Sequence, residues 1–553
     1  MKITWKQLER LWYITALCVI IASLPFSKYG QSFGQFMITG GWIVERFDIR
    51  KLRSFLASQT LAGKLLLFVP YSVYVGLEGI GSGFVQFFKN KPALIFSSIL
   101  LLHVAGLIIT TDFDYAVKDI RTKFPLFLLP LFFSTSEAFD RKGFQRFMLL
   151  FILAALVRSV YNAWLIQTNQ YIDIRDVSRN VSHIIFGLLL TMGIYSLLYF
   201  IIKKELFPGW LRILFLPVVL WFLFYLILSR SFTGIAITVL TLMALIPIII
   251  FKTSKRWMRI SLAASVFIIS TLFFFYFRNL INDYYKVNPV DFSRLEQFTS
   301  RGNRYINNIY GQQTENGNYL WVYIQWDELR ESWARRSKIP FDSVDKKRQP
   351  IAYTVVRFLT SKGWRKDADA VEKLTPSEID AIEKGVANVI FLKEFSIRGR
   401  VYEFLHGFEI YRETGNPTGS TLMQRLEFWK ASIGIIRENW LTGVGTGDMN
   451  LAFQAEYEKM HTKLAPDQRW RSHNQFLSIF VGFGVFGLLW FLWAILYPPF
   501  LQKRYGDFFI LICLIISFLS MITEDTIESQ TGVIFFTFFY SFFLFARKET
   551  DLL

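Results

Sequence analysis

The chain has 553 residues, of which 53% are hydrophobic and 18% aromatic, and its formal net charge is +18. This apolar content is more than one soluble core of this size can hold, so it excludes an ordinary soluble protein and indicates helices that cross a lipid bilayer. The two cysteines, Cys18 and Cys513, lie in apolar runs far apart in the sequence and predict no disulfide framework.

Apolar runs predict about 12 membrane-spanning helices, since a hydrocarbon layer about 30 Å thick needs about 20 apolar residues per helix. The first run is read as an uncleaved span, because no small-residue cleavage site follows it. The segment 65–88 is predicted to be re-entrant or interfacial, since one more crossing would reverse the sides of all later loops. The predicted spans are 11–24, 26–44, 93–111, 124–133, 144–164, 181–202, 211–229, 232–251, 260–277, 476–496, 508–521 and 533–545.

Basic residues favour one orientation, with both termini in the cytoplasm. Basic clusters are retained on the cytoplasmic side, and this orientation places there the clusters at 89–91, 141–146, 203–204, 252–259, 503–504 and 547–548. The segment 112–123 fits less well, because it is predicted outside although it contains Lys118, Arg121 and Lys123.

The longest hydrophilic segment, residues 278–475, is then predicted outside the cytoplasm as a folded loop domain between transmembrane regions 1–277 and 476–553. Tryptophans recur in it, and Thr375-Pro376-Ser377-Glu378 is typical of a capping box that opens a helix. A basic loop outside the membrane favours an anionic ligand such as a lipid diphosphate or an anionic glycan. No nucleic-acid-binding motif is present.

One histidine, His473, lies immediately before the span that begins at Phe476. A histidine at the membrane surface can titrate near neutral pH and act as a base or a hydrogen-bond donor. An equally acceptable interpretation is a structural residue that caps a helix among lipid headgroups.

Three alternate glycines, Gly443, Gly445 and Gly447, precede Asp448 and a predicted helix. Glycines let backbone N–H groups approach an anion, and the start of a helix adds its positive dipole end. A tight turn with Asp448 as a helix cap explains the same pattern, and a lone run of this kind favours that interpretation.

Two arginines and a group of acids are further candidate residues. Helical spacing places Arg425 on an apolar face with Trp429, and Arg230 lies between two spans joined by almost no loop. Both could hold a diphosphate or extend to lipid phosphates. Glu524, Asp525 and Glu528 connect the last two spans; they could bind an acceptor hydroxyl, but pairing with arginines is the favoured interpretation.

Taken in chain order, these segments resemble the O-antigen ligase family, which also includes lipid-linked glycan polymerases and protein O-oligosaccharyltransferases. The matching segments are Ser229-Arg230-Ser231, Arg425 with Trp429, the run 441–447, and residues 472–477 leading into 482–488. The resemblance covers roughly residues 181–545. It implies an all-α, glycosyltransferase C-like membrane fold with a large helical periplasmic loop, in the bacterial inner membrane with its active site on the periplasmic face.

The resemblance also implies an activity. Members transfer a glycan from undecaprenyl diphosphate to an acceptor hydroxyl such as that of lipid A-core, with inversion and without a metal or other cofactor. It implies that His473 activates the acceptor or steadies the leaving group, and that Arg230 and Arg425, with the glycine run, hold the donor diphosphate. Two arginine forks can neutralise a diphosphate leaving group without a metal. Further candidate contacts are Arg471, Asn474, Arg179, His183, Glu524, Asp525 and Glu528.

Three alternatives to a ligase remain open from the sequence. A polymerase or a protein O-oligosaccharyltransferase would use the same donor class, and sequence patterns do not separate them from a ligase. A lipid or solute transporter is less well supported, because midplane polar residues and inverted repeats are not evident. The charged region at about 315–407 resembles an insertion relative to shorter family members, which leaves the acceptor undetermined.

Overall fold

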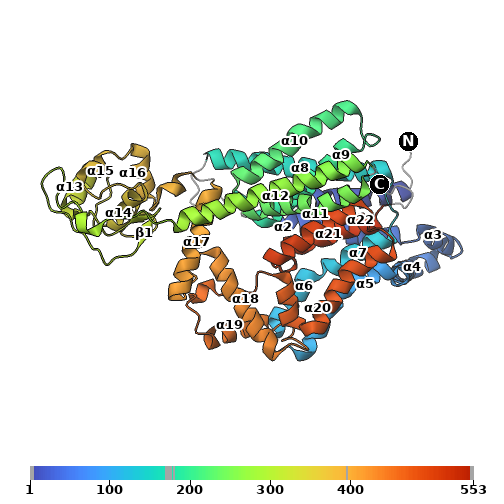
Figure 1. Cartoon of the computed structure of the whole chain (residues 1–553). Helices are drawn as coiled ribbons and strands as arrows, with labels where there is room; N and C mark the ends of the chain where they lie inside the picture. Colours follow the sequence, from blue (N-terminus) through green and yellow to red (C-terminus); the bar gives the residue numbers. More distant parts are fainter. Residues whose placement is uncertain (1–4, 169–176, 179–180, 254, 394–395, 548–553) are drawn as a thin grey trace. The chain divides into compact units, whose positions relative to one another are not determined.

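The computed structural model describes residues 5–168, 177–178, 181–253, 255–393 and 396–547, and these residues are mainly helical (Figure 1). Contacts divide the chain into two compact units. Unit 1 comprises residues 1–249 and 424–553, and unit 2 comprises residues 250–423. The second part of the predicted loop domain, from residue 424, therefore belongs with the transmembrane helices.

Unit 1 is built from two sets of helices that lie far apart in the sequence. The first set is α1 (Trp5–Ser23), α2 (Lys28–Glu45), α3 (Ile49–Ala57), α4 (Leu61–Lys89), α5 (Lys91–Ala105) with the turn η1 (Gly106–Ile109), α6 (Phe113–Lys123), α7 (Pro125–Thr135), α8 (Arg141–Thr168), α9 (His183–Ile202), α10 (Gly209–Leu228) and most of α11 (Phe232–Lys252). The second set is α18 (Thr421–Glu438), α19 (Met449–Lys459), the turn η5 (Pro466–Gln468), α20 (Gln475–Leu501), α21 (Phe508–Thr523), the turn η6 (Thr526–Glu528) and α22 (Gln530–Phe545).

The described residues contain eight helices that are long and apolar enough to cross a membrane: α4, α5 with η1, α8, α9, α10, α11, α12 (Arg256–Tyr285) and α20. Shorter apolar helices, among them α21 and α22, pack between them. These findings confirm an all-α protein with several membrane-spanning helices. The count of 12 spans stays a prediction.

The interior of unit 1 is centred on α22, whose side chains from Thr531 to Phe545 are all buried. The short helix α7 packs beside it, with Phe133 against Phe538 and Phe542. At one end of this pair Lys123 contacts Glu528, and at the other the Phe139 amide donates to the Ala546 carbonyl. The predicted short span at 124–133 is therefore a helix of 11 residues inside the protein.

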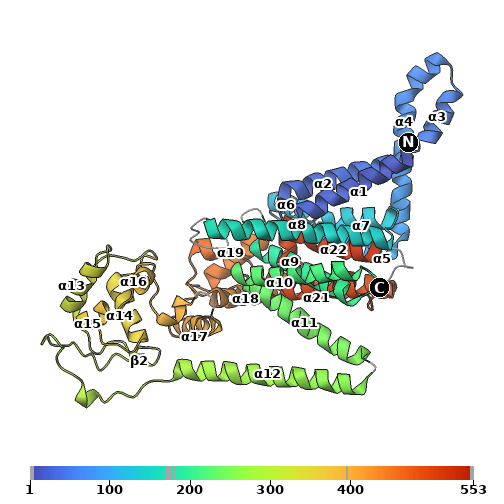
Figure 2. The ribbon, with the colours of Figure 1, turned by 90° about the horizontal axis from the view of Figure 1, so that it is seen from above.

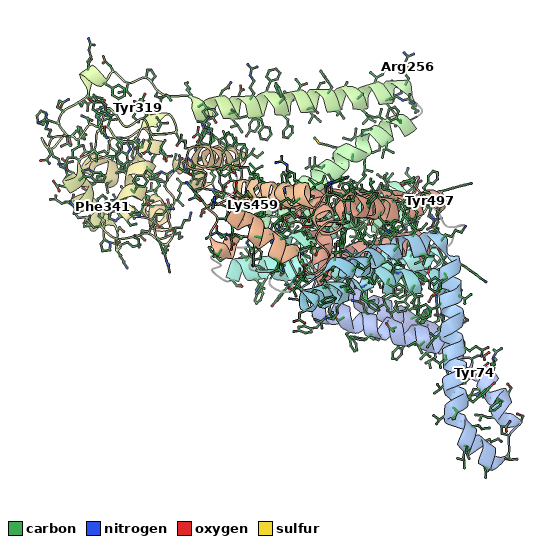
Figure 3. The ribbon with its side chains drawn as sticks, turned by 90° about the horizontal axis from the view of Figure 1, so that it is seen from below. Tyr74, Arg256, Tyr319, Phe341, Lys459 and Tyr497 are labelled. Carbon is green, nitrogen blue, oxygen red and sulfur yellow. The ribbon has the colours of Figure 1, made fainter. Side chains whose placement is uncertain are left out.

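The segment 65–88 lies within one continuous helix, α4, of 29 residues. Figure 2 shows α4 running across the direction of α1, α2 and α8, with its first half and α3 extending beyond them. Tyr74 marks this extended part in Figure 3. The helix α4 is long and apolar enough to cross a membrane, so the re-entrant or interfacial interpretation of residues 65–88 stays a prediction.

Unit 2 contains a small helical core of its own. Its elements after α12 are the turn η3 (Phe292–Arg294), strands β1 (Thr314–Glu315) and β2 (Asn318–Tyr319), α13 (Trp326–Arg336), α14 (Ile351–Ser361), α15 (Ala368–Glu372), α16 (Pro376–Glu383), the turn η4 (Val389–Leu392) and α17 (Ile397–Thr414). The strands pair antiparallel. Trp333, Val355, Phe358 and Ile382 are fully buried together. The predicted capping box is present, since Thr375 and Glu378 accept each other's amide hydrogens.

Candidate active site

The helices α18 and α19 form a hairpin that packs on the first turns of α20. Phe428 of α18, Phe453 and Tyr457 of α19, and Val481 of α20 share one buried cluster. Arg425 lies about one turn before Phe428 on α18. This packing sets the position of Arg425 relative to the loop that leads into α20.

Three of the predicted residues meet at this loop. The His473 Nδ1 lies 3.2 Å from a carboxylate oxygen of Glu524, and the Arg425 guanidinium donates to the other oxygen at 2.7 Å. The His473 ring also stacks on Phe428, with ring centroids 5.6 Å apart. The side chain of His473 is 33% exposed and that of Glu524 is 16% exposed, so the group is reachable from solvent.

This geometry fixes which histidine nitrogen can act as a base. An ionised carboxylate only accepts hydrogen bonds, so the neutral His473 ring donates from Nδ1 to Glu524. The Nε2 atom then carries the lone pair that can take a proton. A histidine oriented by a carboxylate is the arrangement with which many enzymes activate a hydroxyl.

The buried carboxylate of Asp525 holds the backbone of His473. It accepts from the His473 amide at 3.2 Å, from Ser478 Oγ at 2.7 Å and from Ser472 Oγ at 3.2 Å. Burial raises the pKa of this carboxyl above its usual value, against the opposing effect of Arg471. Asp525 therefore fastens the loop before α20 to the loop between α21 and α22.

Asn474 fastens the same loop in a different way. Its side-chain oxygen accepts from the amides of Phe476 and Leu477 and so caps α20, while its side-chain nitrogen donates to the Ile522 carbonyl at 3.0 Å. All of these contacts are made to the protein backbone, so a structural role of Asn474 explains them.

A second, more deeply buried cluster adjoins this loop. Lys123 pairs with Asp119 and donates to Glu528 at 2.8 Å, and Arg471 donates to the same Glu528 oxygen at 3.3 Å. The His103 Nδ1 lies 3.1 Å from Asp119. The Lys123 side chain is fully buried. The cluster thus joins α5, α6 and η6 to Arg471, which lies two positions before His473.

The cations of this cluster keep its acids ionised. Burial alone would raise the pKa of the Glu528 carboxyl, but Lys123 and Arg471 hold that pKa below its usual value. Likewise, burial would raise the pKa of Asp119, but Lys123 and His103 hold it well below its usual value. Arg471 and Glu528 are therefore engaged with buried partners, as the pairing interpretation expects.

Residues 377–492 match the family model described as O-Antigen ligase. The resemblance predicted from the sequence is thereby confirmed over this stretch, which contains Arg425, the glycine run and His473. A comparison with curated proteins gave no match. Glu524 and Lys123 lie outside the stretch matched to O-antigen ligase, so the contacts that each makes are known from the structure and not from that match.

The amides of the glycine run already have partners inside the protein. Gly443, Val444, Gly445, Thr446 and Gly447 donate to Asn439 O, Val481 O, Gly482 O, Gly106 O and Thr110 Oγ1, respectively. No amide from 443 to 447 is left to receive an anion in this described segment. The geometry favours the tight-turn interpretation over diphosphate binding.

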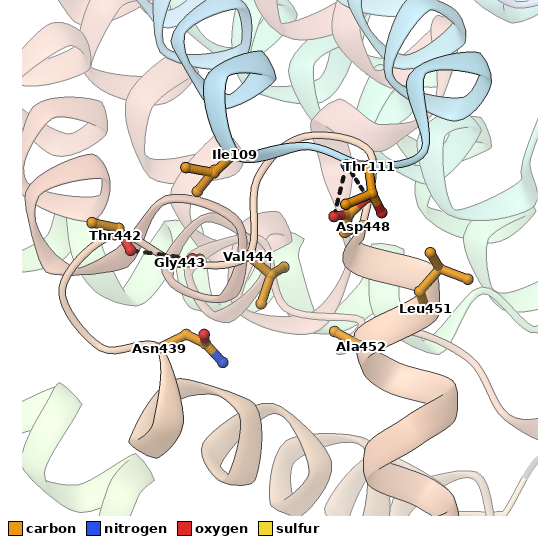
Figure 4. Close-up of a pocket in the computed structure, with 9 residues that line it drawn as sticks. All are labelled: Ile109, Thr111, Asn439, Thr442, Gly443, Val444, Asp448, Leu451 and Ala452. Atoms are coloured by element: carbon orange, nitrogen blue, oxygen red, sulfur yellow. Dashed lines mark hydrogen bonds between the residues drawn. The ribbon is translucent and has the colours of Figure 1, made fainter.

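The glycines are needed because backbone passes close to them. Gly443 has φ +71°, and a Cβ there would lie 2.3 Å from the Phe483 nitrogen; a Cβ on Gly447 would lie 2.1 Å from the Asp112 carbonyl oxygen. Asp448 does not cap α19 and instead accepts from the Thr111 and Asp112 amides. A shallow pocket of about 440 Å³ lies beside this turn (Figure 4), lined by Ile109, Thr111, Asn439, Thr442, Gly443, Val444, Asp448, Leu451 and Ala452.

The remaining predicted residues are less closely tied to His473. Arg230 lies between α10 and α11 in a left-handed conformation, with φ 52° and a half-buried side chain. His183 begins α9 and is half-buried. Arg179 lies outside the described residues. Their roles in donor binding stay predictions.

The sequence did not identify Lys123, Asp119, His103 or Phe428. Lys123 gave one usable signal, because the predicted orientation placed this basic residue on the side of the membrane that disfavours basic residues, directly before an apolar run. A cation in such a place needs a partner. The sequence gave no means of naming Glu528, which lies 405 positions away.

Proposed function

We propose that this chain is a membrane glycosyltransferase that moves a glycan from an undecaprenyl diphosphate-linked donor to an acceptor hydroxyl, such as that of lipid A-core. One observation carries the proposal: His473, Glu524 and Arg425 meet at a solvent-accessible edge of unit 1. The match of residues 377–492 to O-antigen ligase supports the class of reaction. We place this site on the periplasmic face of the bacterial inner membrane, with both termini in the cytoplasm.

In this proposal His473 is the base. Its Nε2 accepts the proton of the acceptor hydroxyl while the hydroxyl oxygen attacks the anomeric carbon of the donor glycan. The bond from that carbon to the diphosphate breaks, and inversion follows from attack opposite the leaving group. Glu524 keeps the ring in the required tautomer and stabilises the imidazolium that forms.

Arg425 neutralises the departing diphosphate. Its guanidinium has five N–H donors, and the bond to Glu524 uses one of them. The others can form the paired hydrogen bonds that suit a phosphate group. Arg230 is proposed as the second arginine of the donor site, and the glycine run is assigned to the fold of the turn.

A reconstituted transfer assay tests the proposal. Purified full-length protein is mixed with an undecaprenyl diphosphate-linked glycan and lipid A-core in the presence of a chelator, and the acceptor is followed by its mobility shift. We expect transfer by the wild type and its loss in His473→Ala. The control is His461→Ala, which replaces another histidine and should retain transfer. A lengthened donor glycan would identify a polymerase instead. No change in either lipid would contradict transfer to a lipid acceptor.

A further inference from the structure

The helix α6 occupies a constrained position in unit 1. It follows α5 and η1, which together form a candidate membrane span that ends at Ile109, and it precedes the buried apolar helix α7, which begins at Pro125. Only 11 residues form α6. Because α5 with η1 is long and apolar enough to cross a membrane and ends at Ile109, we expect α6, which begins at Phe113, to lie at the level of the membrane surface.

One side of α6 is fixed to the protein. Ala116 is fully buried, Asp119 contacts His103, and Lys123 contacts Glu528. These three residues recur at helical spacing and define a single buried face. The remaining faces of α6 therefore have a set orientation.

The exposed part of α6 divides into an apolar and a charged strip. At about 100° per residue, Phe113 and Val117 of α6 and its C-cap residue Phe124 fall within about 40° of one another. Their exposed fractions are 56%, 62% and 45%. Asp114, Lys118 and Arg121 are also exposed and fall on the neighbouring strip. Apolar, charged and buried faces thus follow one another around the helix.

We propose that α6 is an interfacial helix: its apolar strip enters the edge of the hydrocarbon layer, and Lys118 and Arg121 bind lipid phosphates of the same leaflet. An amphipathic helix with basic residues beside its apolar face binds a membrane surface in this way. Three exposed apolar side chains are too few for a stable protein interface, which buries about 800 Å² per partner. Two cations beside the strip are complementary to phosphate headgroups.

The proposal has a consequence for the candidate site. Lys123 on the same helix contacts Glu528, and Arg471, two residues before His473, donates to the same Glu528 oxygen. Through these contacts α6 would hold the loop before His473 at the depth of the headgroups. If the proposed transferase activity is correct, this is the depth at which a lipid-linked diphosphate is presented. The binding of α6 to the membrane surface does not depend on that activity. It also explains why Lys118 and Arg121 lie on the side of the membrane that disfavours basic residues.

A quenching experiment tests the proposal on the full chain. In a background with Cys18→Ala and Cys513→Ala, one cysteine is introduced by Val117→Cys or, as the matched control one residue along the same helix, by Lys118→Cys. Each is labelled with an environment-sensitive fluorophore, and the protein is placed in nanodiscs of phosphatidylcholine with or without phosphatidylglycerol. Quenching is measured with aqueous iodide and with lipids that carry a spin label near the top of the acyl chain.

We expect the label at 117 to be blue-shifted, quenched by the lipid-borne spin label and protected from iodide, with the reverse at 118. A Lys118→Gln/Arg121→Gln variant labelled at 117 should lose any additional protection that phosphatidylglycerol gives. Equal access of iodide to 117 and 118 would overturn the proposal. Protection of 117 from both quenchers would also overturn it, because a protein surface would then cover the strip.

Discussion

His473 is held in a backbone conformation that residues other than glycine uncommonly adopt. Its φ is 45°, in the left-handed region, where a side chain with a Cβ is strained. The Asp525 carboxylate accepts a hydrogen bond from the His473 amide, and the Glu524 carboxylate accepts one from the His473 ring. Such strain persists only where the surroundings determine the conformation, and it is concentrated at functional sites.

At this scale, replacing Glu524 tests whether it orients the base. Glu524→Gln keeps the size of the side chain but removes the charge that favours the Nδ1-protonated ring and stabilises the imidazolium. We expect kcat of glycan transfer to fall by about 10²-fold to 10⁴-fold, the usual contribution of general acid–base catalysis, with little change in thermal stability. Steady-state transfer kinetics and a thermal scan measure the two effects.

A matched control for this prediction is Glu438→Gln, because Glu438 is an exposed acid on α18 that pairs only with exposed Lys459 among the described contacts. Its rate should equal that of the wild type. Wild-type kcat in Glu524→Gln would show that the carboxylate does not take part in the reaction.

Among the residues that the sequence predicted for the site, the structure brings His473, Glu524 and Arg425 together, and the sequence did not show which of their atoms pair. Placing His473 before a span and Glu524, Asp525 and Glu528 between the last two spans was enough to predict that they lie near the same helix ends. Their pairing depends on distances of about 3 Å between side chains on separate elements. The glycine run shows the opposite case, because its anion-binding interpretation could be judged only when the partners of its amides were known.

At the scale of elements, α20 bends where it meets the glycine turn. Gly484 within it has φ 66° and ψ −168°, which is accessible almost only to glycine. A Cβ at this position would lie 2.2 Å from the Leu441 carbonyl oxygen. The bend therefore separates the part of α20 next to His473 from the longer part that continues to Leu501.

Gly484→Ala should consequently destabilise the protein. We expect the strained backbone conformation alone to lower the free energy of unfolding by about 1–3 kcal/mol. This loss should be seen as a lower Tm in detergent. Gly81→Ala on α4 is the control, because a Cβ there meets nothing within 4 Å. An unchanged Tm in Gly484→Ala would mean that the bend is not a fixed part of the folded state.

The buried cluster around Lys123 joins α5, α6, η6 and the loop before α20, so disrupting it should destabilise the packing of all four segments. Lys123→Met leaves Asp119 with His103 alone and deprives Glu528 of one of its two cations. Breaking a buried ion pair from one side costs about 3–5 kcal/mol. We expect a large fall in Tm for this variant.

The double variant Lys123→Met/Asp119→Asn separates charge from packing. If an unpaired buried charge is the cause, removing the Asp119 charge should recover part of the lost Tm. A double variant as unstable as Lys123→Met would contradict this explanation and point to lost packing of the lysine stem.

At the scale of the whole chain, the sequence predicted a helical protein with several membrane-spanning helices, and the hydropathy of long runs was sufficient for this, whereas the predicted loop domain 278–475 is divided between the two units at residue 424. The shorter helices show where hydropathy fails. The helix α7, which begins at Pro125, is apolar because α22 and α5 cover it, and the same composition serves in lipid or inside a protein. The separate core of unit 2 was indicated by its tryptophans, of which Trp333 is fully buried.

Unit 2 contains one buried cation that makes its stability depend on pH. Lys366 is 2% exposed, and its Nζ donates to the Tyr319 carbonyl at 3.4 Å. Burial lowers the pKa of this lysine to about 7 in the folded protein, from 10.5 in an unfolded chain. Between these values the unfolded chain binds more protons than the folded one, so the free energy of unfolding rises with pH, by up to about 1.4 kcal/mol per pH unit.

We therefore expect unit 2 to resist urea better at pH 9 than at pH 7, in a pulse-proteolysis titration of the full-length protein that follows peptides from residues 320–382. Lys366→Met removes the titrating group, so it should abolish this part of the dependence and raise the urea midpoint at pH 7. The exposed Lys384→Met is the control and should keep the slope of the wild type. A slope that persists in Lys366→Met would show that another group is responsible, since a charge that is absent cannot be titrated.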